Sequence, residues 1–168
     1  IKWHRDNAIK QAKNLRRKNI KWSEKFNLGI DVIDNQHRQI LDYINALEKI
    51  RATGAREQIK DVFDDLIDYT QSHFSFEENL LAQVNYQFLP SHRSIHELFV
   101  KRLKDYRQRF DNGESVEDDL YRLLSKWLIN HIQHDDQDYV DAVRDNMLHY
   151  LRSQEQKKGK SWFARWFR

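Results

Sequence analysis

Residues 73–96, HFSFEENLLAQVNYQFLPSHRSIH, decide the fold because they carry two pairs of polar side chains at helical spacing. His73 precedes Glu77 by four residues, and His92 precedes His96 by four. Side chains four residues apart lie on one face of an α-helix, so each pair points toward one place. Pro90, the only proline of the chain, lies between the two pairs and predicts a break between two helices.

The apolar periodicity outside this stretch predicts two further helices. The four predicted helices cover residues 34–51, 56–84, a span that begins after Ser91 as its cap region and ends near residue 111, and 115–151. The apolar residues of the third helix are Ile95, Leu98, Phe99, Leu103 and Tyr106. Four glycines in 168 residues and 33% charged residues favour long solvated helices. Because the connections are short, we predict an all-α fold, an antiparallel up-down-up-down four-helix bundle.

Charge divides the chain into three parts. Residues 1–21 carry a net charge of +7 and residues 152–168 carry +5, which leaves residues 22–151 at −9 in a chain of +3. We therefore expect a basic helical arm or linker at 1–20, the bundle at 21–152 and a basic tail at 153–168. The arm either packs on a partner or leads in from another domain, and a plain solvated linker helix is the alternative. The acidic bundle is a poor binder of nucleic acids.

The last residues of the tail combine aromatic and basic side chains, with Trp162, Phe163, Trp166 and Phe167 among lysines and arginines. Such a segment is typical of contact with an anionic membrane surface or a partner protein, although it could equally fold back over the bundle. No apolar run approaches the roughly 20 residues that cross a bilayer, and no signal-peptide pattern is present. We expect a cytoplasmic protein, associated with membranes at most through this tail.

Histidines recur on every predicted helix, since the first helix adds His37 and the fourth adds His131. The chain has no cysteine, so a metal ion would have to bind nitrogen and oxygen ligands. The neighbours of these histidines in the sequence are apolar, so we expect the histidines to be buried. A buried polar group without a partner costs about 1–3 kcal/mol, and a shared cation would remove that cost. The candidate ligands outnumber those that a single tetrahedral zinc ion binds, which favours a dinuclear centre. A ferritin-like site is not indicated, because no histidine has a glutamate three residues before it.

Residues 20–139 resemble the bacterial hemerythrins. The motifs that carry the resemblance are Gly29-Ile30-Asp31-x-x-Asp34-x-Gln36-His37, His73-Phe74-x-x-Glu77-Glu78, His92-x-x-x-His96 and Trp127-Leu128-x-x-His131-x-x-x-x-Asp136. The resemblance implies two non-haem iron ions. His92, His96 and His131 would bind one of them and His37 and His73 the other. Glu77 and Asp136, with an oxo or hydroxo group, would bridge the two ions.

Asp136 poses a geometric problem, because a residue five positions after His131 lies about 140° around an ideal helix. Helical spacing alone favours Asp135, whereas the family pattern favours Asp136. A local bulge in the fourth helix would reconcile the two. By the same resemblance, Trp127 and Leu128 lie near the oxygen pocket and are candidates for excluding water, with a purely core role as the alternative. His4, His134 and His149 receive no role.

The function that the resemblance implies is reversible dioxygen binding at the di-iron site, for oxygen transport, storage, delivery or sensing. One alternative is a di-iron enzyme that acts on peroxide or nitric oxide, but no extra acid, base or substrate pocket is apparent beside the predicted ligands. We therefore expect no enzyme, beyond a weak peroxidase-type activity. A second alternative is a sensory module of a larger signalling protein, which the basic ends and the missing initial Met suggest.

Overall fold

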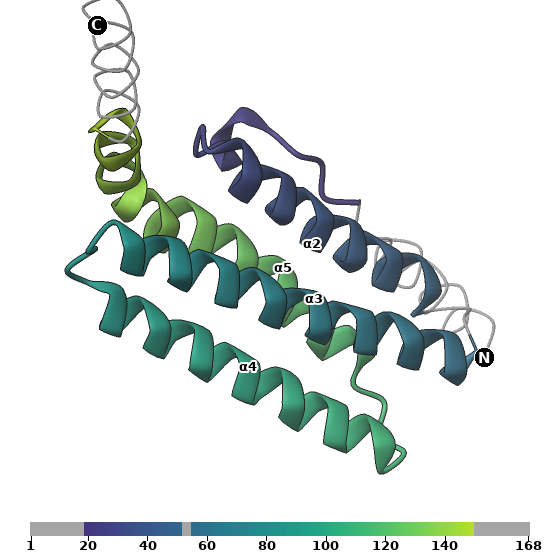
Figure 1. Cartoon of the computed structure of the whole chain (residues 1–168). Coiled ribbons are helices and arrows are strands. Elements are labelled where there is room, and N and C mark those ends of the chain that lie inside the picture. Colours follow the sequence, from purple (N-terminus) through teal and green to yellow (C-terminus); the bar gives the residue numbers. More distant parts are fainter. Residues whose placement is uncertain (1–18, 52–54, 150–168) are drawn as a thin grey trace, which may run out of the picture.

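The computed structural model describes residues 19–51 and 55–149 (Figure 1). Its main helices are α2 (Asp31–Ile50), α3 (Arg56–Gln83), α4 (Leu89–Asp111) and α5 (Glu117–Asn130). Helix α3 packs against both α2 and α4, and α5 packs against α2. The predicted four-helix bundle is therefore confirmed. Most of the predicted arm at 1–20 and the whole tail at 153–168 lie outside the described residues.

The third and fourth helices differ from the prediction. Helix α4 begins at Leu89, before Ser91, so Ser91 is not its cap; Pro90 instead fits in the first turn, where its missing N–H has no helical partner to lose. Leu98, one of the apolar residues of this helix, is 59% exposed and lies outside its packed face. The last helix is not continuous. After α5 the chain forms a π-helical turn, η2 (His131–Asp136), then a 3-10 turn, η3 (Gln137–Tyr139), and then the helical residues 140–149.

The end of the bundle where α3 begins and α4 finishes is filled by apolar side chains. Phe63 of α3 is fully buried and its ring lies 6.0 Å from that of Phe110 of α4. Leu103, Leu120 and Leu124 are buried in the same core. Burying a large apolar side chain stabilises a fold by about 1.5–3 kcal/mol, so this end needs no ligand to hold it together.

The segment before α2 is fixed at both ends. The backbone of Ile20 exchanges two hydrogen bonds of 2.9 Å with the side-chain amide of Asn45. Asp34, in the first turn of α2, accepts hydrogen bonds from the backbone N–H groups of Leu28 and Gly29 at 2.9 and 3.0 Å. Gly29 has a φ of +72°, and a Cβ there would lie 2.5 Å from a nitrogen of Arg144. A larger residue at position 29 would therefore strain the start of the helix that carries His37.

Among the residues described, no helix combines the length and the apolar character that a membrane crossing requires.

Candidate metal centre

Seven polar side chains from four helical segments meet in the middle of the bundle. Helix α2 contributes one, α3 two, α4 two and the π-helical turn two. Each is at most 4% exposed to solvent. They are the residues that the sequence analysis singled out as metal ligands: His37, His73, Glu77, His92, His96, His131 and Asp136.

Five of the seven form one tight group, in which one ligand atom from each residue lies within 4.8 Å of all the others. The Nε2 atom of His92 lies 3.2 Å from the Glu77 carboxylate, and that of His96 lies 3.1 Å from it. The Nε2 atoms of His96 and His131 are only 3.0 Å apart. Asp136 completes the group with Oδ1 at 3.0 Å from His131 Nε2. Three imidazoles and two carboxylates thus face one small volume.

The second group consists of His37, His73 and Glu77, again with ligand atoms within 4.8 Å of one another. Glu77 belongs to both groups and therefore lies between them. The Asp136 carboxylate also contacts the second group, because its Oδ2 lies 3.2 Å from His37 Nε2. The geometry is that of two adjacent cation positions with two shared carboxylates, one with three histidines and one with two.

Several polar atoms at this centre have no hydrogen-bond partner within the described part of the chain. His37 Nδ1 and His73 Nε2 have none at all among the described residues. His37 Nε2 and the two Asp136 oxygens have no well-aligned hydrogen bond there, although they face each other and His131 Nε2 at 3.0–3.2 Å. A buried polar group without a partner costs about 1–3 kcal/mol, so this arrangement needs something further to satisfy it. Imidazole and carboxylate donors suit iron, zinc and other first-row divalent metals. The site therefore fits a pair of such ions.

Electrostatics sets the protonation states of these side chains before any metal binds. Burial lowers the pKa of His73 to about 4, so its ring is neutral at pH 7. Burial also acts to lower the pKa of His131, but the carboxylates of Asp136 and Asp135 outweigh it and raise that pKa to about 10. Burial disfavours the charged form of Glu77, yet hydrogen bonds with the two α4 histidines hold its pKa well below the usual range. The centre thus holds an ionised Glu77 beside a protonated His131 and a neutral His73.

The π-helical turn explains how Asp136 reaches the centre. A π-helix bonds residue i to residue i+5, so it brings together side chains that a regular α-helix would separate. The predicted bulge is present at this place, residues His131–Asp136. Asp135, the competing candidate, points elsewhere: its Oδ2 lies 2.9 Å from Nδ1 of His131, on the outer side of that ring.

The two candidate pocket residues have different surroundings. The ring of Trp127 stacks on that of His131, with centroids 4.3 Å apart and planes 18° apart, and also on that of Phe99 at 3.7 Å. Leu128 is 3% exposed and lines a small apolar hollow of about 10 Å³. Its other lining residues are Trp22, Phe26, Leu41, Ile129 and Ile132.

The comparison with known proteins agrees with this geometry. Residues 28–143, more than half of the chain, match the family described as Hemerythrin HHE cation binding domain. The chain belongs to the hemerythrin family.

Relatives and solved structures support this membership. Bacteriohemerythrin of Pseudomonas paraeruginosa (strain DSM 24068 / PA7) is 46% identical over 144 residues, which cover 86% of this chain and 92% of that protein. Bacteriohemerythrin of Stenotrophomonas maltophilia (strain R551-3) is 42% identical over 80% of this chain and 88% of its own length. A crystal structure of wild-type hemerythrin superimposes with a TM-score of 0.72 at 31% identity, covering 75% of this chain and 98% of that one. Hemerythrins are oxygen-binding proteins of the non-haem iron kind.

One residue of this hemerythrin-family centre was not among the predicted site residues. Tyr139 is fully buried, and its hydroxyl donates a short hydrogen bond to Glu77 Oε1. Burial and the nearby carboxylates raise the pKa of Tyr139 well above its ordinary value, so the hydroxyl remains a donor. It therefore holds the carboxylate that the two groups share. The available signal was its position three residues after Asp136, which places both on one face of a helix.

Proposed function

We propose that this chain binds dioxygen reversibly at a non-haem di-iron centre. His92, His96 and His131 would hold one iron, His37 and His73 the other, and Glu77 and Asp136 would bridge them. The observation that carries the proposal is the pair of overlapping ligand groups, which share Glu77 and differ in their number of histidines. Two iron ions there would supply the reversible exchange of electrons with dioxygen that amino-acid side chains lack.

The unequal groups support oxygen binding in particular. With both carboxylates shared, the two-histidine position has one protein ligand fewer than the other. A position with fewer protein ligands is the one that an external ligand can occupy, as in other metalloproteins that keep an open coordination position. Oxygen storage, delivery and sensing all require this same property.

The walls of the centre favour reversible binding over turnover. All seven proposed ligands are nearly fully buried. Trp127 stacks on both His131 and Phe99, and Phe74 stacks on His96, so aromatic rings cover two of the ligand imidazoles. Such surroundings exclude water and slow the entry of protons, which favours release of an intact ligand.

The test is the visible absorption spectrum of iron-loaded, reduced protein before and after exposure to air. We expect a visible band that appears with oxygen and disappears when oxygen is removed under argon, without consumption of a reductant. The variant His96→Ala should lose the band and bind less iron. The matched control is His134→Ala, which changes an exposed histidine in the same π-helical turn and should keep both. A retained band in His96→Ala, or iron-loaded wild type with no oxygen-dependent band, would contradict the proposal.

A further inference from the structure

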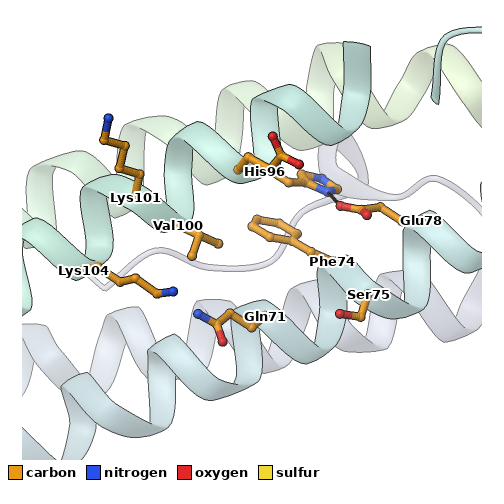
Figure 2. Close-up of a pocket in the computed structure, with 9 residues that line it drawn as sticks. Gln71, Phe74, Ser75, Glu78, His96, Val100, Lys101 and Lys104 are labelled. Carbon is orange, nitrogen blue, oxygen red and sulfur yellow. Dashed lines mark hydrogen bonds and ion pairs between the residues drawn. The ribbon is translucent and has the colours of Figure 1, made fainter. Parts of the chain in front are cut away.

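The outer nitrogens of two histidines in the larger group contact carboxylates. Nδ1 of His96 lies 3.0 Å from Glu78 Oε1, a contact drawn in Figure 2. Nδ1 of His131 lies 2.9 Å from Asp135 Oδ2. Glu78 is itself held in place, because Arg93 donates a hydrogen bond of 2.8 Å to its second oxygen. Two of the three imidazoles in this group therefore have a negatively charged partner on the side that faces away from the centre.

The smaller group lacks such partners. Nδ1 of His73 lies 2.8 Å from Oε1 of Gln36, which is a neutral amide. The outer nitrogen of His37, Nδ1, has no hydrogen-bond partner within the described ranges. The two groups thus differ in the charge of their outer partners as well as in their number of histidines.

The contacts on the ring faces of the histidines also differ between the two groups. His96 stacks on Phe74 with centroids 3.8 Å apart and planes 5° apart, and Figure 2 shows Phe74 below the His96 ring. Both residues line a groove of about 570 Å³. His131 stacks on Trp127. His37 and His73 meet each other edge to face, at 4.8 Å and 72°. His96 and His131 of the larger group are therefore each held by a carboxylate at the ring edge and by an aromatic ring at the ring face. These contacts restrict the two side chains before a metal ion binds.

A carboxylate that accepts the outer N–H of a metal-binding histidine fixes its tautomer and makes it a stronger donor. Loss of such a partner typically lowers metal affinity about 10–100-fold. We propose that the two metal positions fill in a fixed order: the three-histidine position first and tightly, and the two-histidine position second and weakly. Glu78 and Asp135 act as positioning residues for the first position, and Gln36 does so for the second. This inference rests on the ligand assignment of the proposed function.

The test is a calorimetric titration of metal-free protein with Zn²⁺, repeated with Co²⁺, whose visible spectrum reports the ligands of each ion as it binds. Wild type should bind two ions in two resolved steps. Glu78→Gln and Asp135→Asn should each weaken the first step about 10–100-fold, and Asp135→Glu should restore part of that loss. Gln36→Glu should strengthen the second step about tenfold while the first stays unchanged. Glu97→Gln is the matched control, because Glu97 is an exposed acid that lines the same groove as Glu78.

Several outcomes would overturn the inference. They are two equal steps in wild type, a Glu78→Gln variant that weakens only the second step, and a Gln36→Glu variant that leaves the second step unchanged. Melting temperatures of the metal-free variants separate a general loss of structure from a change at the metal. Two ordered zinc steps in a protein whose iron form shows no oxygen-dependent band would leave this inference standing and refute the proposed function. Failure to bind any Zn²⁺ or Co²⁺ would refute the shared ligand assignment.

Discussion

Helix α3 runs through two regions of opposite character. Near its start Phe63 and Leu66 are fully buried among apolar side chains, whereas three turns later His73 and Glu77 are equally buried among polar ones. The first region is satisfied by the protein alone. The second contains two ring nitrogens, His37 Nδ1 and His73 Nε2, without a hydrogen-bond partner in the described residues. The apolar end therefore stabilises the bundle by itself, whereas the centre is a less stable arrangement of buried polar groups that suits a metal site.

The largest expected effect comes from the apolar end. Replacing Phe63 by Ala should lower the free energy of unfolding by about 3–5 kcal/mol, because a fully buried ring leaves a cavity against Phe110. The loss should be nearly the same with and without bound metal, since Phe63 lies about 15 Å along the helix from His73. Chemical denaturation of both forms measures this. The control Phe88→Ala removes a ring that is 55% exposed and should change stability by less than about 0.5 kcal/mol. A much larger loss in one metal state would mean that the two regions are coupled.

The next effect should appear mainly in the metal-bound state. Replacing His37 by Leu removes Nδ1, which has no hydrogen-bond partner in the described residues, but also Nε2, which lies 3.2 Å from Asp136. The two changes oppose each other, so the metal-free protein should change in stability by no more than about 1 kcal/mol. The same variant should lose the added stability that a second bound metal ion gives to wild type. Thermal unfolding with and without Zn²⁺ measures both. His134→Leu changes an exposed histidine and should keep that added stability. A strongly destabilised metal-free His37→Leu protein would show that the centre is well satisfied without metal.

The pH dependence of metal binding should be smaller but distinctive. His131 has its pKa raised to about 10, so at neutral pH a metal ion must displace its proton. From this group alone, Zn²⁺ affinity should rise roughly tenfold per pH unit between about pH 7 and 9. His73, with a pKa of about 4, releases no proton in this range. The proton on His131 stabilises the metal-free fold below its unfolded pKa of about 6.5, and that stability is lost as pH rises through about 10. Calorimetry in buffers of different ionisation enthalpy counts the released protons, and a pH-independent affinity would contradict the expected protonation state.

The smallest effect concerns the hydroxyl of Tyr139. Tyr139→Phe keeps the buried ring but removes the hydrogen bond to Glu77, so stability should fall by about 1–2 kcal/mol. Zn²⁺ should also bind less tightly, because the shared carboxylate loses the group that orients it. The control Tyr43→Phe removes a hydroxyl on the partly buried Tyr43–Tyr69 pair and should leave Zn²⁺ affinity unchanged. Equal affinities for the Tyr139→Phe variant and wild type would remove Tyr139 from the centre.

Much of the fold and the candidate site could be predicted from the sequence because helical spacing is a local property. His73 with Glu77 and His92 with His96 each follow the i, i+4 rule, and the structure brings all four together. Apolar periodicity likewise predicted four helices, and these are confirmed. That the seven residues bind iron stays a prediction.

The remainder depends on details that spacing does not contain. The start of α4 was placed too late because Pro90 reads as a breaker, although it is tolerated in a first turn. Gln36, Glu78 and Asp135 were present in the motifs or beside them, but their contacts with histidine nitrogens depend on how each helix is rotated. Tyr139 was missed because a buried tyrosine resembles an ordinary core residue until its hydroxyl partner is known.

The π-helical turn has a further consequence for how this chain can change over generations. Losing one amino acid between residues 131 and 136 would rotate every later side chain of that helix by about 100°. Tyr139, Val140 and Val143, which are now buried, would swing out toward water together with Asp136. A single-codon deletion there would therefore destroy the metal site and also unpack the end of the bundle. Relatives that have lost metal binding should thus differ by substitutions at the ligands and keep the extra residue.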